Sequence, residues 1–283
     1  PRHPLAGVRA VDLSRIIAGP CAARVLAELG AEVMSIQSET RLDWALSFHL
    51  IFNAGKRSVT LDFTDDDGKE KLWAILDDFS PDVLIHNYRH LDLAETIGVG
   101  PEQVRERFPG ITYTHLNAYG NHGVWKDRPG FEQVVQAVSG IQVAYARGGR
   151  PKLLPSPIID IGCGLLGAFA SLLGLYRRRR TGVGAVSTTH LTSMAVLLHL
   201  QRVADFQRSL APADEERQTV GGIVNLRGGP VCVAGPRGDL RNWLTRAGIA
   251  KANGDPIAAL AAAARRISIG DLRHSIARAG ATG

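Results

Sequence analysis

The chain is poor in cysteine, and its cysteines are widely spaced. The 283 residues include three, Cys21, Cys163 and Cys232, and no CxxC pair. An odd number of distant cysteines does not match a disulfide framework, so we expect a reducing, cytoplasmic compartment. Histidine pairs such as His86 and His90 also lack a carboxylate or thiol at ligand spacing, so no metal site is predicted.

A secretory leader is missing as well. The sequence opens on Pro1 without a basic region followed by an apolar one, so we expect a processed, excised or internal start rather than a signal peptide. The uncharged stretch 161–176 is followed by four arginines, but it is shorter than the ~20 residues that cross a bilayer. It predicts a buried core helix and no membrane partner.

The chain has only a small excess of basic over acidic residues. Lys and Arg number 33 against 27 Asp and Glu, which gives a net charge of +6. A basic protein attracts polyanions, but scattered basic residues fit a phosphate-bearing small molecule better than a nucleic acid. With 45% hydrophobic and 21% charged residues, the chain can bury a sizeable core.

The sequence does contain an alternation of strand and helix patterns. Residues 8–13 predict a strand, residues 20–29 a helix, and residues 32–36 a second strand, which together form a βαβ unit. Parallel sheets bind ligands at the carboxyl ends of their strands, and this rule places the loop of residues 14–19 at a binding site.

The alternation continues to about residue 206, so the fold class is α/β. We predict a Rossmann-like parallel-sheet large domain over residues 1–207. A stretch rich in charge, residues 208–218, is typical of a linker. Residues 208–283 are therefore predicted to form this linker and a small α+β domain.

A GxGxxG pattern occurs at Gly162, Gly164 and Gly167, at the start of a predicted helix. The nicotinamide-binding fingerprint needs an acidic residue about 20 positions further on, and that region here holds the arginine run. We interpret the glycines mainly as close-packing positions of a helix. Dinucleotide binding is the minor alternative.

Asp160 is the most informative acidic residue. It follows Pro157, Ile158 and Ile159 and stands at the head of the uncharged helix. A carboxylate there either caps the free N–H groups of the helix or, in an apolar setting, attacks an acyl carbonyl as a nucleophile. Glu132 is open in a similar way: it is either an ordinary first-turn helix acid or a second carboxylate near the first.

Several segments between about residues 4 and 199 together resemble the class III CoA-transferase family, which includes formyl-CoA transferase, carnitine CoA-transferase and α-methylacyl-CoA racemase. Their order and spacing carry the resemblance. The segments are PLAGVRAVDL (4–13), AGP (18–20), LAELGAEV (26–33), NAGKRSVTLD (53–62), NYR (87–89), DRPGFE (127–132), QAVSG (136–140), PIIDIGCG (157–164) and RTG (180–182).

The resemblance implies an acyl-CoA:carboxylate CoA-transferase. In the family, the aspartate at the position of Asp160 attacks the acyl-CoA thioester and forms an aspartyl anhydride, then an aspartyl-CoA thioester. Glu132 matches a family carboxylate beside that nucleophile. CoA is then part of a substrate, no tightly bound cofactor is implied, and a small carboxylate is the second substrate. The residues expected to lie along CoA are Arg15, Ile16, Leu61, Thr64, Asn87, Tyr88 and Arg89.

The chain departs from the family pattern where CoA phosphates are bound. Gln37 and Ser38 stand where a basic residue commonly follows the second strand. Thr64 replaces a lysine, and a family arginine falls on Glu95 or Thr96. Since basic side chains there bind phosphate through charge-assisted hydrogen bonds, we expect weaker CoA binding.

The second half of the family pattern is incomplete. The glycine-rich loop that closes over the family's active site has only poor candidates, glycines 221–222 and 228–229. The chain is also shorter than a typical member, so the small α+β domain is predicted to be shortened. Family members form dimers, and we expect a homodimer or a heteromer with a related subunit.

Three alternatives to a self-sufficient transferase follow from these departures. The chain is a subunit or half of a heteromeric or tandem enzyme, whose partner completes the CoA site. It is an acyl-CoA racemase or isomerase, although Phe131 replaces the histidine of that branch and leaves His122 as the substitute base. Or it is a non-catalytic scaffold, which the retention of both carboxylates disfavours.

Overall fold

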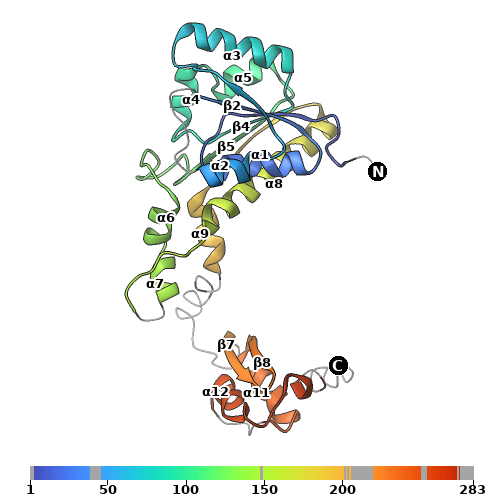
Figure 1. Cartoon of the computed structure of the whole chain (residues 1–283), viewed down its shortest axis with the longest axis vertical. Helices are drawn as coiled ribbons and strands as arrows, with labels where there is room; N and C mark the ends of the chain where they lie inside the picture. The colour runs from blue at the N-terminus through green and yellow to red at the C-terminus, as the bar shows by residue number, and fades with distance from the viewer. Residues whose placement is uncertain are drawn as a thin grey trace. The chain divides into compact units, whose positions relative to one another are not determined.

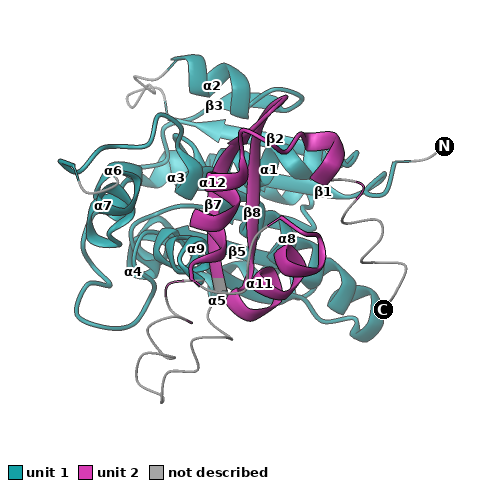
Figure 2. Cartoon of the chain, turned by 90° about the horizontal axis from the view of Figure 1, so that it is seen from below, with its two compact units in different colours: residues 1–200 teal, residues 201–283 magenta. Residues whose placement is uncertain are grey.

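The chain forms two compact units, residues 1–200 and 201–283 (Figure 2). The computed structural model describes residues 3–38, 46–146, 149–200, 202, 204, 219–249, 254–272 and 274. The domain boundary predicted after residue 207 and the predicted linker at residues 208–218 lie outside the described residues.

Unit 1 contains a six-stranded parallel sheet with the strand order β3-β2-β1-β4-β5-β6. The strands are β1 (Arg9–Asp12), β2 (Glu32–Gln37), β3 (Arg57–Thr60), β4 (Val83–His86), β5 (Thr112–Asn117) and β6 (Ala185–His190). This is the strand order of a doubly wound Rossmann-like sheet, and the predicted α/β fold is confirmed. The order reverses between β1 and β4, and the carboxyl ends of these two strands flank the crevice where such sheets bind ligands.

Helices cover both faces of the sheet (Figure 1). The helices of unit 1 are α1 (Ala18–Glu28), α2 (Leu46–Phe52), α3 (Asp66–Phe79), α4 (Leu91–Ile97), α5 (Pro101–Arg107), α6 (Glu132–Val138), α7 (Ile141–Ala146), α8 (Ile158–Thr181) and α9 (Leu191–Leu198). On one face, Leu72 and Leu76 of α3 pack against Leu84 of β4. On the other, Leu26 of α1 and Ile159 of α8 share a core with the sheet.

Helix α8 has 24 residues and is longer than the uncharged stretch in the sequence. Length and mean hydropathy alone would allow it to cross a membrane, so the expectation that it is too short was wrong. Its buried residues pack inside unit 1, which is typical of a core helix. They are Ile159, Gly162, Cys163, Gly164, Gly167, Ala168, Ser171 and Gly174.

The glycines of the GxGxxG pattern lie inside α8 and face close neighbours. A β-carbon on Gly164 would stand 2.6 Å from the backbone oxygen of Ala18, and one on Gly167 would stand 2.9 Å from Leu116. Helix α8 therefore approaches α1 and the sheet closely. The close-packing interpretation is confirmed for these two positions.

Unit 2 is a small α+β arrangement. The antiparallel hairpin β7 (Thr219–Leu226) and β8 (Gly229–Pro236) packs with α11 (Arg237–Arg246) and α12 (Pro256–Ala263). Val224, Leu244 and Leu260 are at the centre of its core. Gly228 in the hairpin turn and Gly229 at the start of β8 have φ of 102° and 133°, a region that favours glycine.

Candidate active site

The carboxyl ends of β1 and β4 bring together residues that are distant in the sequence. Arg15 and Ile16 follow β1, and Asn87 follows β4. The Asn87 side chain holds the Arg15 peptide on both sides: its Oδ1 accepts from the Arg15 backbone N–H at 3.0 Å, and its Nδ2 donates to the Arg15 carbonyl at 2.7 Å. The structure thus brings together three of the residues predicted to lie along CoA, at the carboxyl ends of two neighbouring strands.

Tyr88 and Arg89, which follow Asn87, point into different environments. Tyr88 packs against the core between the sheet and α3, and its ring lies 4.8 Å from that of His86. Its hydroxyl oxygen is buried and has no hydrogen-bond partner among the described residues, and burial raises the pKa of this phenol. Arg89 is exposed to solvent. Of the two side chains, only that of Arg89 is freely accessible to a phosphate.

Leu61 and Thr64 follow β3, which is separated from β1 by β2. The Leu61 N–H donates to the Gln37 carbonyl at 2.8 Å, and the exposed Thr64 hydroxyl donates to Asp62 at 2.8 Å. Gln37, which stands where a basic residue was expected, donates through Nε2 to the carbonyl of Ser14 at 3.3 Å. The residue therefore links β2 to the loop after β1.

Asp160 is the third residue of α8 and does not cap it. The N-cap position is Pro157, and no side chain makes a cap hydrogen bond from there. The interpretation of Asp160 as an N-cap was therefore wrong. Its side chain is partly buried, and its carboxylate is not used to satisfy the start of the helix.

Glu132 satisfies the start of α8 instead. This buried residue opens α6, and its Oε2 accepts from the backbone N–H of Asp160 at 2.7 Å while Oε1 accepts from that of Ile159 at 3.3 Å. Gln136 donates to Oε1 at 2.6 Å. The first N–H groups of a helix have no partner within it, and a carboxylate is favourable there. The structure thus places the second predicted carboxylate directly beside Asp160.

The environment of Asp160 favours the neutral, protonated form of its side chain over the ionised form. Burial, with a smaller contribution from the charge of Glu132, raises the pKa of Asp160 to about 7. Desolvation and a like charge both disfavour the ionised form. A carboxylate whose ionisation is centred near neutral pH is poised for proton exchange or nucleophilic attack.

An apolar cluster lies beside Asp160 and joins three elements. Ile17, Cys21 and Phe52 form its buried part, and Ile16, Phe48 and Ile161 pack against it. Ile161 is the neighbour of Asp160, and the Cys21 thiol lies 3.8 Å from the Ile161 carbonyl oxygen. Burial raises the pKa of Cys21 and brings that of Cys163 to about 12, so neither thiol is an active nucleophile at neutral pH.

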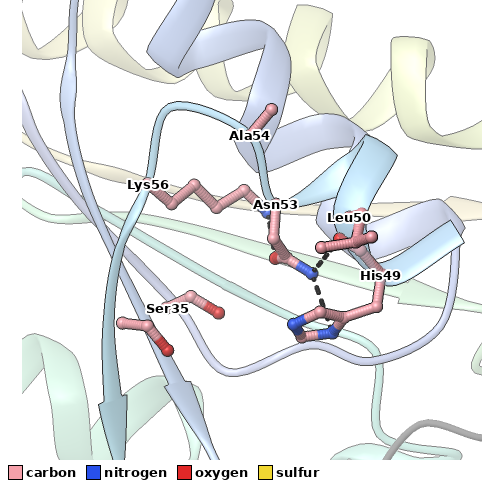
Figure 3. Close-up of a pocket in the computed structure, with 7 residues that line it drawn as sticks. Ser35, His49, Leu50, Asn53, Ala54 and Lys56 are labelled. Carbon is pink, nitrogen blue, oxygen red and sulfur yellow. Dashed lines mark hydrogen bonds between the residues drawn. The ribbon is translucent and has the colours of Figure 1, made fainter. Parts of the chain in front are cut away.

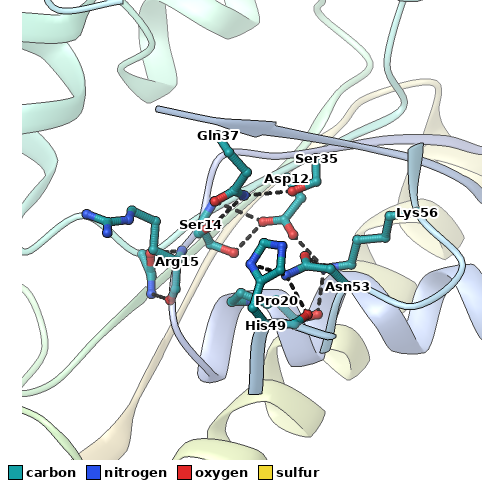
Figure 4. A network of polar contacts seen from close by, with 10 residues as sticks. Asp12, Ser14, Arg15, Pro20, Ser35, Gln37, His49, Asn53 and Lys56 are labelled. Carbon is teal, nitrogen blue, oxygen red and sulfur yellow. Dashed lines mark hydrogen bonds and ion pairs between the residues drawn. The ribbon is translucent and has the colours of Figure 1, made fainter. Parts of the chain in front are cut away.

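A buried ion pair between Asp12 and Lys56 was not predicted from the sequence (Figure 4). Asp12 lies at the end of β1, and the two charged groups are 2.7 Å apart with almost no solvent exposure. The only local signal was a carboxylate inside the apolar run of β1. Its partner is 44 positions away, a separation at which sequence patterns carry no information.

A cavity of about 260 Å³ opens beside this ion pair (Figure 3). Figure 3 shows Asn53 directed toward His49, with Nδ2 3.3 Å from His49 Nδ1. The lining residues are Ser35, His49, Leu50, Asn53, Ala54, Lys56 and Ser58. None of them belongs to the set predicted to lie along CoA.

The histidines do not form a metal site within the described ranges, where no group of three or more metal-ligating side chains occurs. His86 stacks on His115 with ring centroids 4.6 Å apart. Burial lowers the pKa of His115 to about 4, so it is neutral in the fold. Phe131 and His122, which bear on the isomerase alternative, are both exposed.

Comparison with known proteins agrees with the geometry. Residues 5–265 match the family model described as CoA-transferase family III. The chain is 32% identical over 241 residues to the probable fatty acyl-CoA transferase Rv3272 of Mycobacterium tuberculosis, covering 78% of this chain and 60% of that protein.

Two further relatives are CoA-transferases by name. Mouse succinyl-CoA:glutarate CoA-transferase is 31% identical, with 72% of this chain and 49% of that protein covered. The beta subunit of succinyl-CoA–L-malate CoA-transferase from Chloroflexus aurantiacus is 32% identical, with 64% and 47% covered. The chain thus spans 60% or less of the length of these curated relatives.

Solved structures share the fold. A crystal structure of Rv3272 superposes with a TM-score of 0.75 at 25% identity and covers 99% of this chain and 81% of that one. A CAIB/BAIF family protein from Brucella suis gives a TM-score of 0.68 at 23% identity, with 99% and 83% covered. By the family match over nearly its whole length, the chain belongs to family III of the CoA-transferases.

Proposed function

We propose that the chain carries the nucleophile of an acyl-CoA:carboxylate CoA-transferase, with Asp160 as that nucleophile. The observation that carries the proposal is the environment of Asp160, whose carboxyl group is free of capping duty, partly buried and raised in pKa to about 7 beside the fixed carboxylate of Glu132. Family membership supplies the reaction class.

The reaction divides into four acyl exchanges, each a displacement at a carbonyl carbon. The Asp160 carboxylate attacks the acyl carbon of the donor thioester; the C–S bond breaks, CoA thiolate leaves, and Asp160 is left in a mixed anhydride with the donor acyl group. The thiolate attacks the aspartyl carbonyl, which releases the donor carboxylate and leaves an aspartyl-CoA thioester. The acceptor carboxylate displaces the thiolate again, and the thiolate finally attacks the acceptor acyl carbon, which regenerates Asp160.

Glu132 assists without reacting. Its oxygens accept the first N–H groups of α8, so its carboxyl group is fixed in place next to Asp160. A negative charge fixed there makes the ionised form of Asp160 less stable and therefore more reactive. The two carboxylates, in different environments, thus have different roles.

The substrates are proposed by class. Acyl-CoA is the donor and a small carboxylate the acceptor, since relatives are named for succinyl-CoA with glutarate or L-malate. CoA would lie along the edge formed by Arg15, Ile16 and Asn87, with Arg89 exposed to reach a phosphate. Leu61, Thr64 and Tyr88 remain proposed contacts, and no tightly bound cofactor is proposed.

Assembly with a second chain is also a proposal. A homodimer or a heteromer with a related subunit is supported by the relative named as a beta subunit and by exposed apolar side chains on α8. Cytoplasmic location is supported by free Cys21, Cys163 and Cys232. We propose neither nucleic acid nor a membrane as a partner.

Trapping the covalent intermediate tests the function. The chain is incubated with a panel of acyl-CoAs, treated with hydroxylamine and analysed by intact mass. An aspartyl hydroxamate on Asp160 is expected, and Asp160→Asn should abolish it while the control Asp92→Asn, on the first turn of α4, retains it. An unchanged adduct in Asp160→Asn would contradict the proposal.

The same assay separates the alternatives. An adduct that appears only after a related subunit is added indicates a heteromer or half enzyme. Deuterium uptake at the acyl α-carbon from heavy water, without CoA exchange, would indicate isomerase chemistry and overturn the transferase proposal.

A further inference from the structure

The ion pair between Asp12 and Lys56 connects three elements at one buried point. The Lys56 ammonium donates to Asp12 Oδ2 at 2.7 Å, to the Pro20 carbonyl in the first turn of α1 at 2.9 Å, and to Asn53 Oδ1 after α2 at 2.9 Å. An ammonium has three N–H groups, so its donors are fully used. Lys56 is therefore committed to structure and not available to bind a phosphate.

The other oxygen of Asp12 fixes the turn that follows β1. Asp12 Oδ1 accepts from the Ser14 backbone N–H at 2.9 Å and from the Ser14 hydroxyl. Ser14 in turn lies so close to Gly19 that a β-carbon on this glycine would stand 2.2 Å from the Ser14 β-carbon. Figure 4 shows Ser14 between Asp12 and Gln37, held from both strands.

The turn leads into a strained residue. Asn87 holds the Arg15 peptide on both sides, and the next residue, Ile16, has a φ of 73°. A β-branched residue rarely adopts positive φ, and such strain persists only where surrounding contacts fix the backbone. The hydrogen bonds to Ser14 and Arg15 are contacts of this kind.

The strained residue Ile16 belongs to the apolar cluster beside Asp160, which forms a wall next to the nucleophile. Ile16 and Ile17 belong to the apolar cluster that includes Ile161, the neighbour of Asp160. Phe48 and Phe52 of α2 belong to the same cluster, and Asn53, which Lys56 binds, directly follows that helix. The ion pair thus holds both sides of the cluster, the β1–α1 turn and the end of α2.

We propose that Asp12 and Lys56 are positioning residues for acyl transfer, which hold the strained turn and α2 so that Ile16 and its neighbours shield Asp160 from water. This inference rests on the proposed function of Asp160 as nucleophile. Neither residue reacts: Asp12 acts through its hydrogen bonds with Ser14, and Lys56 acts through the Pro20 carbonyl and Asn53. Without the pair, the turn relaxes, water reaches the carboxylate, and a solvated carboxylate is a weaker nucleophile.

The test compares acylation of Asp160 as a function of pH in four proteins. Besides the wild type, they are the double variant Asp12→Asn with Lys56→Gln, which leaves no unpaired buried charge, the variant Ile16→Ala, and the control Arg57→Gln. The control removes the exposed ion pair of Arg57 with Glu32, one residue along the chain. Adduct formation is followed by quenched intact mass at saturating acyl-CoA.

The double variant and Ile16→Ala are expected to acylate about tenfold more slowly or worse, with the pH midpoint lower by about one unit. The groups that face Asp160 are Glu132 of α6 and the thiols of Cys21 and Cys163. None of these groups is changed in these proteins. A shift of the pH midpoint therefore indicates a change in how well the apolar cluster shields Asp160 from water. A smaller folded fraction would lower the amplitude without moving the midpoint, and Arg57→Gln should match the wild type.

The results distinguish a failure of the proposed function from a failure of the positioning role. A wild type that forms no adduct, either alone or with a related subunit added, contradicts the proposed function. A wild-type adduct with an unchanged rate and midpoint in a folded double variant overturns the positioning role alone. Where the double variant does not fold, Ile16→Ala decides by the same two criteria.

Discussion

Two carboxylates beside the start of one helix have different tasks, and hydrogen bonding explains the division. Glu132 accepts two backbone N–H groups of α8 and the amide of Gln136. Asp160 sits in the same turn, and its own N–H is already bound by Glu132. The capping role is therefore filled from outside the helix, which leaves the Asp160 side chain available to a substrate.

The pH dependence of acylation follows from this arrangement. Asp160 attacks only as a carboxylate, and its pKa lies near 7 because of burial first and Glu132 second. The acylation rate should therefore rise with pH through about 7 and level off above it. Rates of adduct formation measured from pH 5 to pH 9 (about two units on each side of the midpoint) with saturating acyl-CoA test this.

Glu132→Gln separates the two causes. It removes the like charge and keeps a carbonyl acceptor for α8, so the midpoint should move below that of the wild type. It should stay above the ordinary aspartate value of 3.8, because burial is the larger cause. A midpoint that is unchanged or higher in this variant would show that Glu132 does not act on Asp160 electrostatically.

From the sequence, Asp160 and Glu132 could be named but not their contact, and neither Asp12 nor Lys56 was singled out. Asp160 and Glu132 are 28 positions apart, and Asp12 and Lys56 are 44 apart. Such pairs depend on the packing of whole elements. Local sequence also could not separate a cap from a nucleophile at Asp160, because the two differ only in where the helix begins.

Helix α8 shows the same limit for an element. Its GxGxxG pattern allowed two interpretations, and the neighbours of each glycine decide between them. Gly164 faces the Ala18 backbone and Cys21, and Gly167 faces Leu116. Small residues let α8 approach α1 and β5, and this approach sets the position of Asp160 beside the β1 loop.

The backbone contact of Gly164 predicts a marked loss of stability in Gly164→Ala. The new methyl group would stand 2.6 Å from the Ala18 oxygen, which cannot rotate away. We expect a loss of about 1–3 kcal/mol in the free energy of unfolding, measured by chemical denaturation.

Gly162→Ala is the matched control on the same helix. There the new methyl group meets the side chain of Met194, which is flexible and can move. Alanine also has the better helix propensity, by about 1 kcal/mol, so the net change should be small. Equal losses in the two variants would contradict the packing account.

Part of the regular structure could be predicted, but several short helices could not. The strand–helix–strand unit of β1, α1 and β2 was expected close to where it occurs. Helices α2, α4 and α7 have seven residues or fewer and were missed. A helix of two turns shows too little periodicity to be distinguished from a loop. α2 matters most among these, because it supplies part of the wall beside Asp160.

For the whole molecule, the strand order explains the location of the site. The order reverses between β1 and β4, and the loops after these strands carry Ile16 and Asn87. The sequence predicted a parallel sheet and a site at its carboxyl edge. It could not predict which strands are neighbours, because β1 and β4 are separated by two strands in the chain.

Unit 1 also presents an apolar stripe, defined by Leu165, Phe169, Leu173 and Tyr176 of α8. These side chains are between 52% and 59% exposed, and their spacing places them on one face of the helix. The opposite face is buried against α1 and the sheet. A continuous exposed apolar stripe is a mark of an interaction surface.

The stripe predicts the assembly state. If a second copy of the chain covers it, the double variant Leu165→Glu with Phe169→Glu should shift the protein from dimer to monomer in light scattering, because carboxylates at the centre of an apolar interface are desolvated without partners. The control Val124→Glu changes an apolar side chain that is 94% exposed in a loop outside the stripe, and it should leave the mass unchanged. A wild type that is monomeric, or a stripe variant that keeps the wild-type mass, would contradict this role of α8.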